Sequence, residues 1–183
     1  AVTLLREHVN REYGLEGVEL SDRVNQLLMS TATIINDERG LPYAVRRQGA
    51  GLGDIAKAIA SPVYLDVEGS TMPKLELGDD PSRRGVYSMQ FHVKNMSNET
   101  RAYDLGAMVM TESVSIDGIT VAEQAYMLDD AKTTYYVDGV KNTDGKVTVG
   151  ADGDVVISVT IELTGADKDY LDASFENGMY VEG

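Results

Sequence analysis

Alternation of hydrophobic and polar residues dominates the last two thirds of the chain. In residues 88–94, 103–109 and 154–163, apolar side chains alternate with polar ones, and this period of two is typical of half-buried β-strands. Further short stretches with strand character are 63–67, 74–77, 113–116, 146–149 and 179–181. Turn residues, mainly Gly, Asp and Asn, separate these stretches. The pattern predicts an antiparallel β-sheet fold, interrupted only by one helical turn at residues 166–173.

The first 60 residues follow helical spacing instead. Val2, Leu5 and Val9 fall on one face until Gly14 ends the pattern, which predicts an amphipathic helix over residues 1–13. Ser21, with Asp22 behind it, predicts the N-cap of a second helix, whose apolar side is formed by Val24, Leu27 and Leu28.

A third short helix is predicted from Gly53 or Asp54 to Ile59, and residues 30–51 between the second and third helices are predicted to be an irregular loop. These helices have apolar faces but no strand of their own to cover. A helical piece of about 60 residues without a sheet is a poor independent domain. We therefore expect it to be part of something larger.

Two units meet at Ala60-Ser61-Pro62, because the residue before a proline disfavours helix. The predicted domains are residues 1–60, helical and incomplete, and residues 61–183. About seven or eight short strands over about 120 residues favour an antiparallel sandwich of the immunoglobulin or fibronectin type III kind. The formal net charge of −14 is divided unevenly, with −1 in residues 1–60 and −13 in residues 61–183.

The composition limits the kinds of partner that the chain can bind. With 43% hydrophobic residues the chain is globular rather than disordered. The acidic excess opposes nucleic acid and anionic membranes, since the basic pairs Arg46-Arg47 and Arg83-Arg84 are isolated. Cysteine is absent, which excludes disulfides and thiol catalysis. No apolar run reaches the length of about 18 residues that a membrane span requires.

Several segments, in order, carry a family resemblance. They are Leu28-Met29-Ser30-Thr31-Ala32-Thr33, Arg46-Arg47-Gln48-Gly49-Ala50-Gly51, Lys57-Ala58-Ile59, Val93-Lys94-Asn95, Ala102-Tyr103 and the closing run Asn177 to Gly183. Together they resemble the end of a subtilisin-like (S8, subtilase) catalytic domain and the fibronectin-like domain that follows it. The resemblance is to the cell-envelope group that includes C5a peptidase and lactocepin, and it covers essentially all 183 residues.

The resemblance implies an exported serine endopeptidase, secreted or at the surface of a Gram-positive bacterium. Subtilases use an Asp, a His and a Ser that lies in a Gly-Thr-Ser-Met-Ala-x-Pro turn, and none of these motifs occurs here. The resemblance makes residues 1–13 the later part of the nucleophile-bearing helix, with the Ser shortly before Ala1. We therefore assign no catalytic, cofactor-binding or metal-binding residue. The expected partners are the upstream catalytic segment of the same protease and its protein or peptide substrate.

Other chemistry has weak support in the sequence. His8 and His92 are the only histidines, and Ser30 and Ser61 lack the sequence context of a nucleophile. The glycines of residues 48–53 follow no strand and precede no Lys-Ser/Thr, so they predict a tight turn rather than a phosphate loop.

Acidic loops at Asp79-Asp80, Asp129-Asp130, Asp152/Asp154 and Asp167/Asp169 lack calcium-loop spacing. Solvated turn carboxylates are the favoured interpretation. Calcium in the parent protease is left open, and no cofactor is assigned to this chain.

Two hypotheses of function remain. The first is a non-catalytic portion of a subtilisin-like endopeptidase, inactive alone. The second is a free-standing β-sandwich adhesion or binding module with a helical docking arm. They differ in what covers the apolar side chains of the arm, namely Val2, Leu5, Val24, Leu27 and Leu28. In a protease these side chains bury against strands from another segment, whereas in a free module they fold back onto the sandwich.

Overall fold

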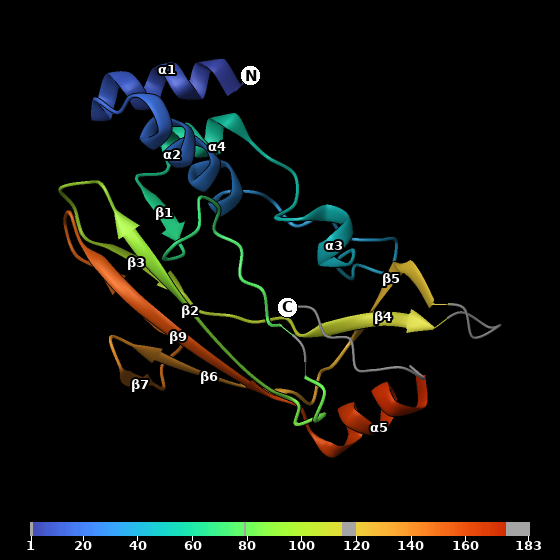
Figure 1. The fold of residues 1–183 in the computed structure, drawn as a ribbon. Helices are drawn as coiled ribbons and strands as arrows, with labels where there is room; N and C mark the ends of the chain where they lie inside the picture. Colours follow the sequence, from blue (N-terminus) through green and yellow to red (C-terminus); the bar gives the residue numbers. More distant parts are fainter. Residues whose placement is uncertain (1, 79, 115–119, 175–183) are drawn as a thin grey trace.

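The computed structural model describes residues 2–78, 80–114 and 120–174 (Figure 1). Within them, helices come first and antiparallel strands follow, with one helix after the last strand. We call residues 2–60 the helical segment and residues 63–174 the β part. None of the described helices has the length and apolar character needed to cross a bilayer.

The helical segment contains α1 (Val2–Tyr13), α2 (Gly17–Ser30), α3 (Val45–Gln48) and α4 (Ile55–Ala60). α1 and α4 confirm the predicted helices. α4 begins as expected at Asp54, whose Oδ1 accepts hydrogen bonds from the amides of Ala56 (2.9 Å) and Lys57 (3.2 Å), the usual way to satisfy free N–H groups at a helix start.

The predicted N-cap of the second helix is wrong. α2 begins at Gly17, so Ser21 lies inside the helix and its hydroxyl donates to the Gly17 carbonyl (3.1 Å). The same hydroxyl accepts a hydrogen bond from Arg6 of α1 (2.9 Å). A serine within a helix can bond back to the preceding turn, and here it also links two helices.

The loop between α2 and α4 is irregular as predicted, apart from the single turn of α3. Two isolated antiparallel bridges, Thr33 with Leu52 and Asn36 with Pro42, hold it together. The Gln48 side chain crosses the loop, accepting from the Ile35 amide (2.7 Å) and donating to the Tyr43 carbonyl (2.6 Å).

The three main helices pack against one another. Their shared core consists of Leu5, Val9, Leu20, Val24, Leu27 and Ala58, closed by Tyr64 of the first strand. The expectation of unmatched helical faces is therefore wrong, because these faces cover each other. Among the side chains predicted to form these apolar faces, Val2 is the exception, with 48% of its surface exposed.

The main sheet has five antiparallel strands in the order β1-β2-β9-β6-β7. They are β1 (Val63–Asp66), β2 (Val86–Asn95), β9 (Asp154–Glu162), β6 (Lys132–Val137) and β7 (Val140–Asn142). β3 (Arg101–Asp104) pairs with β8 (Lys146–Val149), and β4 (Met110–Val114) pairs with β5 (Thr120–Met127).

A second hydrophobic core lies between the main sheet and the β3–β8 pair. It is formed chiefly by Tyr87, Val93, Val147, Val149, Val155, Ile157, Val159, Ile161, Leu163 and Leu171. Alternate residues of β9 contribute, since successive side chains of a strand point to opposite faces. The predicted fold class is confirmed: a mainly antiparallel β-protein, consistent with a β-sandwich, with a short helical segment.

Several element predictions need correction. Residues 74–77 form no strand, and the predicted strand at 103–109 is regular only as far as Asp104. The helical turn at 166–173 is the longer α5 (Gly165–Ser174). The sequence pattern does not predict β5, β6 and β7. Residues 115–116 of one predicted strand and all of 179–181 lie outside the described residues.

Candidate functional site

A row of charged side chains crosses three strands on the face of the main sheet opposite the core of the β part. Lys94 Nζ lies 2.7 Å from Asp66 Oδ2 and 3.8 Å from Asp154 Oδ2. His92 Nδ1 lies 2.8 Å from Asp154 Oδ1. The antiparallel register explains this grouping, because Asp66 pairs with His92 and Lys94 pairs with Asp154. We call Asp66, His92, Lys94 and Asp154 the charged row.

Electrostatics within the charged row follow from these contacts. The hydrogen bond to Asp66 raises the pKa of Lys94 above its ordinary value of 10.5, because the carboxylate stabilises the ammonium form. Nearby, burial raises the pKa of Tyr64 above 10.0. Both groups therefore keep their protons at neutral pH, so neither is poised as a general base.

The structure separates the histidines from the serines considered as nucleophiles. Ser30 Oγ accepts from the Leu65 amide (2.8 Å), and Ser61 Oγ donates to the Val63 carbonyl (2.7 Å). His8 lies on α1, where its ring meets the edge of Tyr13. Among the described residues, neither serine forms a hydrogen bond to a histidine. A nucleophile needs an adjacent base for activation, and this geometry supplies none for Ser30 or Ser61.

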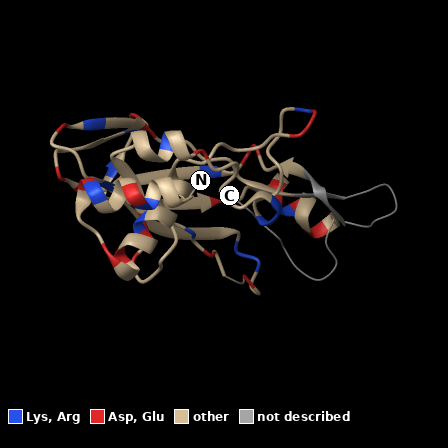
Figure 2. Ribbon diagram, turned by 90° about the horizontal axis from the view of Figure 1, so that it is seen from above, with Lys and Arg blue, Asp and Glu red and all other residues tan. Residues whose placement is uncertain are grey.

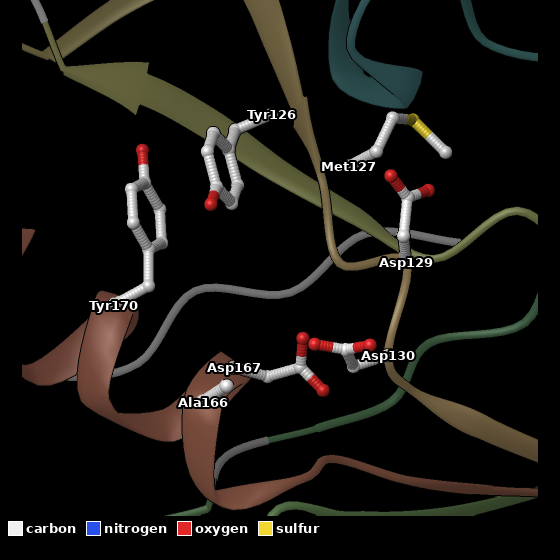
Figure 3. A pocket seen from close by; sticks show the side chains of 7 residues that line it. All are labelled: Tyr126, Met127, Asp129, Asp130, Ala166, Asp167 and Tyr170. Carbon is white, nitrogen blue, oxygen red and sulfur yellow. The ribbon is translucent and has the colours of Figure 1, made fainter.

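A small hollow lies beside α5 (Figure 3). Its volume is about 190 Å³, and its lining is Tyr126, Met127, Asp129, Asp130, Ala166, Asp167 and Tyr170. The rings of Tyr126 and Tyr170 are stacked, with centroids 3.6 Å apart and planes at 5°. The turn at Asp129-Asp130 thus meets Asp167, which lies in α5 and not in a loop as the sequence predicts.

The carboxylates of the hollow have ordinary structural explanations. Asp167 is 5% exposed, and its Oδ2 accepts from the amide (2.8 Å) and hydroxyl (2.9 Å) of Thr164 at the start of α5. Asp129 and Asp130 occupy an exposed turn. Within residues 2–78, 80–114 and 120–174, no three His, Asp or Glu side chains are grouped so that they could hold a metal ion.

Basic and acidic side chains are interspersed over the fold. Figure 2 shows basic and acidic positions interspersed along the ribbon, without a single gathering of basic residues. Exposed ion pairs such as Arg83–Asp172 (2.6 Å) and Lys74–Glu76 (2.8 Å) neutralise part of the basic charge locally. A phosphate backbone needs clustered Lys and Arg, and the described part of the chain shows no such gathering in Figure 2.

Comparison with known proteins relates this mainly antiparallel chain to bacterial peptidases, although no protein-family model matches it. The relatives are C5a peptidases of Streptococcus pyogenes. One is 28% identical over 182 residues, which is 98% of this chain. Those of serotypes M18 and M1 are 28% identical over 166 residues and 26% identical over 182 residues.

The chain is thus homologous to C5a peptidase, which confirms that part of the resemblance drawn from the sequence. It spans only about 14% of the length of these relatives. The narrower resemblance to lactocepin and the assignment of particular domains stay predictions.

Proposed function

We propose that the chain is a non-catalytic portion of a subtilisin-like serine endopeptidase of the bacterial cell envelope. Residues 1–60 would be the C-terminal segment of its catalytic domain, and residues 61–183 the adjoining fibronectin type III-like domain. The observation that carries this proposal is the extent of the similarity, 182 residues or 98% of the chain. An alignment of this length includes both the helical segment and the β part.

The surface of the helical segment supports its place in a larger catalytic domain. Among the described residues, twelve large hydrophobic residues are exposed, and six of them lie in this first third of the chain: Val2, Leu4, Val18, Ile34, Ile35 and Leu52. Leu4, Val18 and Leu52 are each more than 60% exposed. Single exposed apolar residues are normal, but this concentration suits a segment that other parts of a peptidase cover.

The role we propose for the helical segment is support of the active site. By the resemblance, α1 continues the helix that carries the nucleophile. Leu5 and Val9 of α1, both fully buried, fix it against α2 and α4. Since catalysis depends on sub-ångström placement of the nucleophile, this packing would contribute to activity without supplying a reacting group.

The proposed partners follow from the homology. They are the upstream catalytic segment of the same chain and, for the whole peptidase, a protein or peptide substrate. The proposed location is the surface of a Gram-positive bacterium, where a net charge of −13 in residues 61–183 would favour solubility.

An active-site label tests the proposal. A fluorophosphonate probe is added to the 183-residue chain and to the complete protein that contains it, and the labelled residue is mapped by mass spectrometry. We expect no label on the chain alone and a labelled serine upstream of Ala1, within a Gly-Thr-Ser-Met-type motif. A complete protein that takes no label, or a label within residues 1–183, would contradict the proposal.

One observation favours the second candidate, a free-standing binding module with a helical docking arm. Tyr64 and Met96 from the β part join the core of the helical segment, so the arm folds partly onto the sandwich, as that hypothesis expects. The labelling experiment separates the two, because a binding module contains no reactive serine in any form of the protein.

A further inference from the structure

Strand β1 contributes to both hydrophobic cores of the molecule. Val63 (6% exposed) belongs to the core of the β part, whereas the next residue, Tyr64 (6% exposed), belongs to the core of the helical segment. This division follows from the alternation of side chains along a strand. In Figure 1, β1 lies directly beneath α2 and at the margin of the main sheet. A single strand therefore joins the two parts.

The next residue on the same face as Tyr64 is Asp66, which bonds to α2 of the helical segment and to β2 of the main sheet. Its Oδ1 accepts a hydrogen bond from Gln26 Nε2 of α2 (2.7 Å), and its Oδ2 lies 2.7 Å from Lys94 Nζ of β2. Gln26 is 7% exposed, and the side chain of Asp66 is 18% exposed. Loss of the Asp66 carboxylate would leave a largely buried amide donor without its partner, which is costly.

Arg23 fixes the orientation of the Gln26 side chain. Its Nε donates to Gln26 Oε1 (3.2 Å), so the amide nitrogen of Gln26 must face Asp66. The Arg23 guanidinium also lies 3.8 Å from the centroid of the Tyr64 ring, within the range of a cation–π interaction. At the last residue of α2, Ser30 Oγ accepts from the Leu65 amide (2.8 Å). The contact between α2 and β1 thus combines directional polar bonds with the burial of Tyr64 in the helical core.

We propose that Asp66 is a positioning residue, which holds α2 and, through the packing of α2 on α1, sets the placement of α1 relative to the sheet. The consequence for catalysis rests on the proposed function, in which α1 carries on from the nucleophile. The helical segment and the β part then form one rigid body, not two domains joined by a hinge at residues 60–62.

A directional contact suits this role better than an apolar one. Buried charge pairs contribute little net free energy of folding, and in some proteins they fix a single arrangement of the chain. Asp66 satisfies two donors from two elements at once, so a shift of α2 along β1 would break its bond to Gln26. Asp154 provides an internal comparison. It pairs with Lys94, as Asp66 does, and with His92. Among the described residues, it pairs with none that belongs to the helical segment.

Hydrogen exchange followed by mass spectrometry tests the proposal on the 183-residue chain. The variants are Asp66→Ala, which removes both bonds, Asp66→Asn, which keeps an acceptor for Gln26, and Asp154→Asn as matched control. We expect Asp66→Ala to speed exchange in α1 and α2 about tenfold and to leave β9 within about twofold of the parent. Asp66→Asn should restore most of the protection, and Asp154→Asn should leave α1 and α2 unchanged.

An equal rise throughout the chain, no rise in α1, or the same rise in Asp154→Asn would overturn the proposal. If Asp66→Ala does not fold, Gln26→Met tests the same contact from α2 and keeps the Asp66–Lys94 pair. It should raise exchange in α1 and α2 alone, and a failure to do so counts equally against Asp66.

The complete protein separates this inference from the proposed function. There we expect Asp66→Ala to lower kcat on a peptide substrate with KM little changed, and Asp66→Asn to recover part of kcat. If exchange rises in α1 and α2 but kcat stays at the parent value, Asp66 positions α1 as inferred, and the catalytic role proposed for the helical segment is wrong.

Discussion

The helical segment and the β part bury their apolar surface to different degrees. In the β part, the main sheet and the β3–β8 pair close around a core that includes Ile157 and Val149, both fully buried. The helical segment has a smaller core and carries half of the exposed large hydrophobic residues found among those described. Among the described residues, both regions thus have a buried core, but the helical segment exposes more large apolar side chains for its length. The two regions differ at the surface rather than in the interior.

The two regions also differ in net charge. Residues 61–183 carry −13 of the net charge of −14, much of it as carboxylates of turn residues, whereas residues 1–60 carry only −1. A nearly neutral surface with exposed apolar side chains is suited to contact with protein. A strongly acidic surface is suited to water.

The largest effect should follow truncation in the core of the β part. Ile157 is fully buried in β9, between Phe91 of β2 and Val137 of β6. Ile157→Ala should lower the free energy of unfolding by about 2–5 kcal/mol, measured by urea titration with circular dichroism. Leu27→Ala, at one of the fully buried positions in the helical core, should cost a similar amount. Both variants should keep one transition, and a separate early transition in Leu27→Ala would show that the regions unfold independently.

A smaller effect should follow a change at the loop between α2 and α4. Gly51 has φ of +109°, and a Cβ there would collide with the Thr33 carbonyl oxygen. Gly51→Ala should cost about 1–3 kcal/mol and loosen the bridge between Thr33 and Leu52. Gly53→Ala is the control, since its Cβ would meet only Leu28 Cδ2 at 4.0 Å. Thermal unfolding of both variants measures the difference, and equal melting temperatures would contradict the strain at Gly51.

Removal of a helix cap should have a more modest effect. Asp54→Ala leaves the amides of Ala56 and Lys57 without their acceptor, so we expect a loss of about 0.5–2 kcal/mol. Asp54→Asn keeps an acceptor oxygen and should retain most of the stability. Urea titration compares the two, and a full loss in Asp54→Asn would mean that the charge matters rather than the hydrogen bond.

The smallest effect should appear at acid pH in the β part. The hydrogen bond from the Gly85 amide (2.8 Å) lowers the pKa of Asp80 below its ordinary value of 3.8. A lowered folded-state pKa contributes stability above pH 3.8, and this contribution is lost as the pH falls through the folded-state value. The melting temperature of the parent should therefore drop more steeply between pH 5 and pH 2 than that of Asp80→Asn. Parallel curves would exclude this contribution.

Predictions from the sequence agree with the structure where one face of an element is buried and the other is exposed to solvent. β2 and β9 have this pattern, and α1 shows the helical equivalent in Leu5 and Val9. The sequence pattern does not predict β6, because its residues Lys132–Val137 do not alternate between polar and apolar, and five of the six are half-buried. A usable signal was present beside it: Asp138-Gly139, both with positive φ, is a typical two-residue hairpin turn, and it joins β6 to β7.

The contacts of the candidate site were less accessible to sequence. Asp66, Lys94 and Asp154 are far apart along the chain, and only the register of three antiparallel strands brings them together. Nothing in the sequence indicates that Gln26 is buried, since a glutamine on a helix is usually solvated. Its burial depends on how α2 meets β1, which no local pattern encodes. The homology, in contrast, could be anticipated from short segments, because it depends on their order.

The two faces of β1 also matter for protein engineering. Under the domain assignment proposed above, a chimera of the catalytic part of one peptidase and the sandwich of another would naturally be cut at the proline after Ser61. Such a cut would separate Tyr64 and Asp66 from the helices that they contact. A graft that respects the fold would carry the partner residues Arg23 and Gln26 with the sandwich, or would transplant β1 together with the helices.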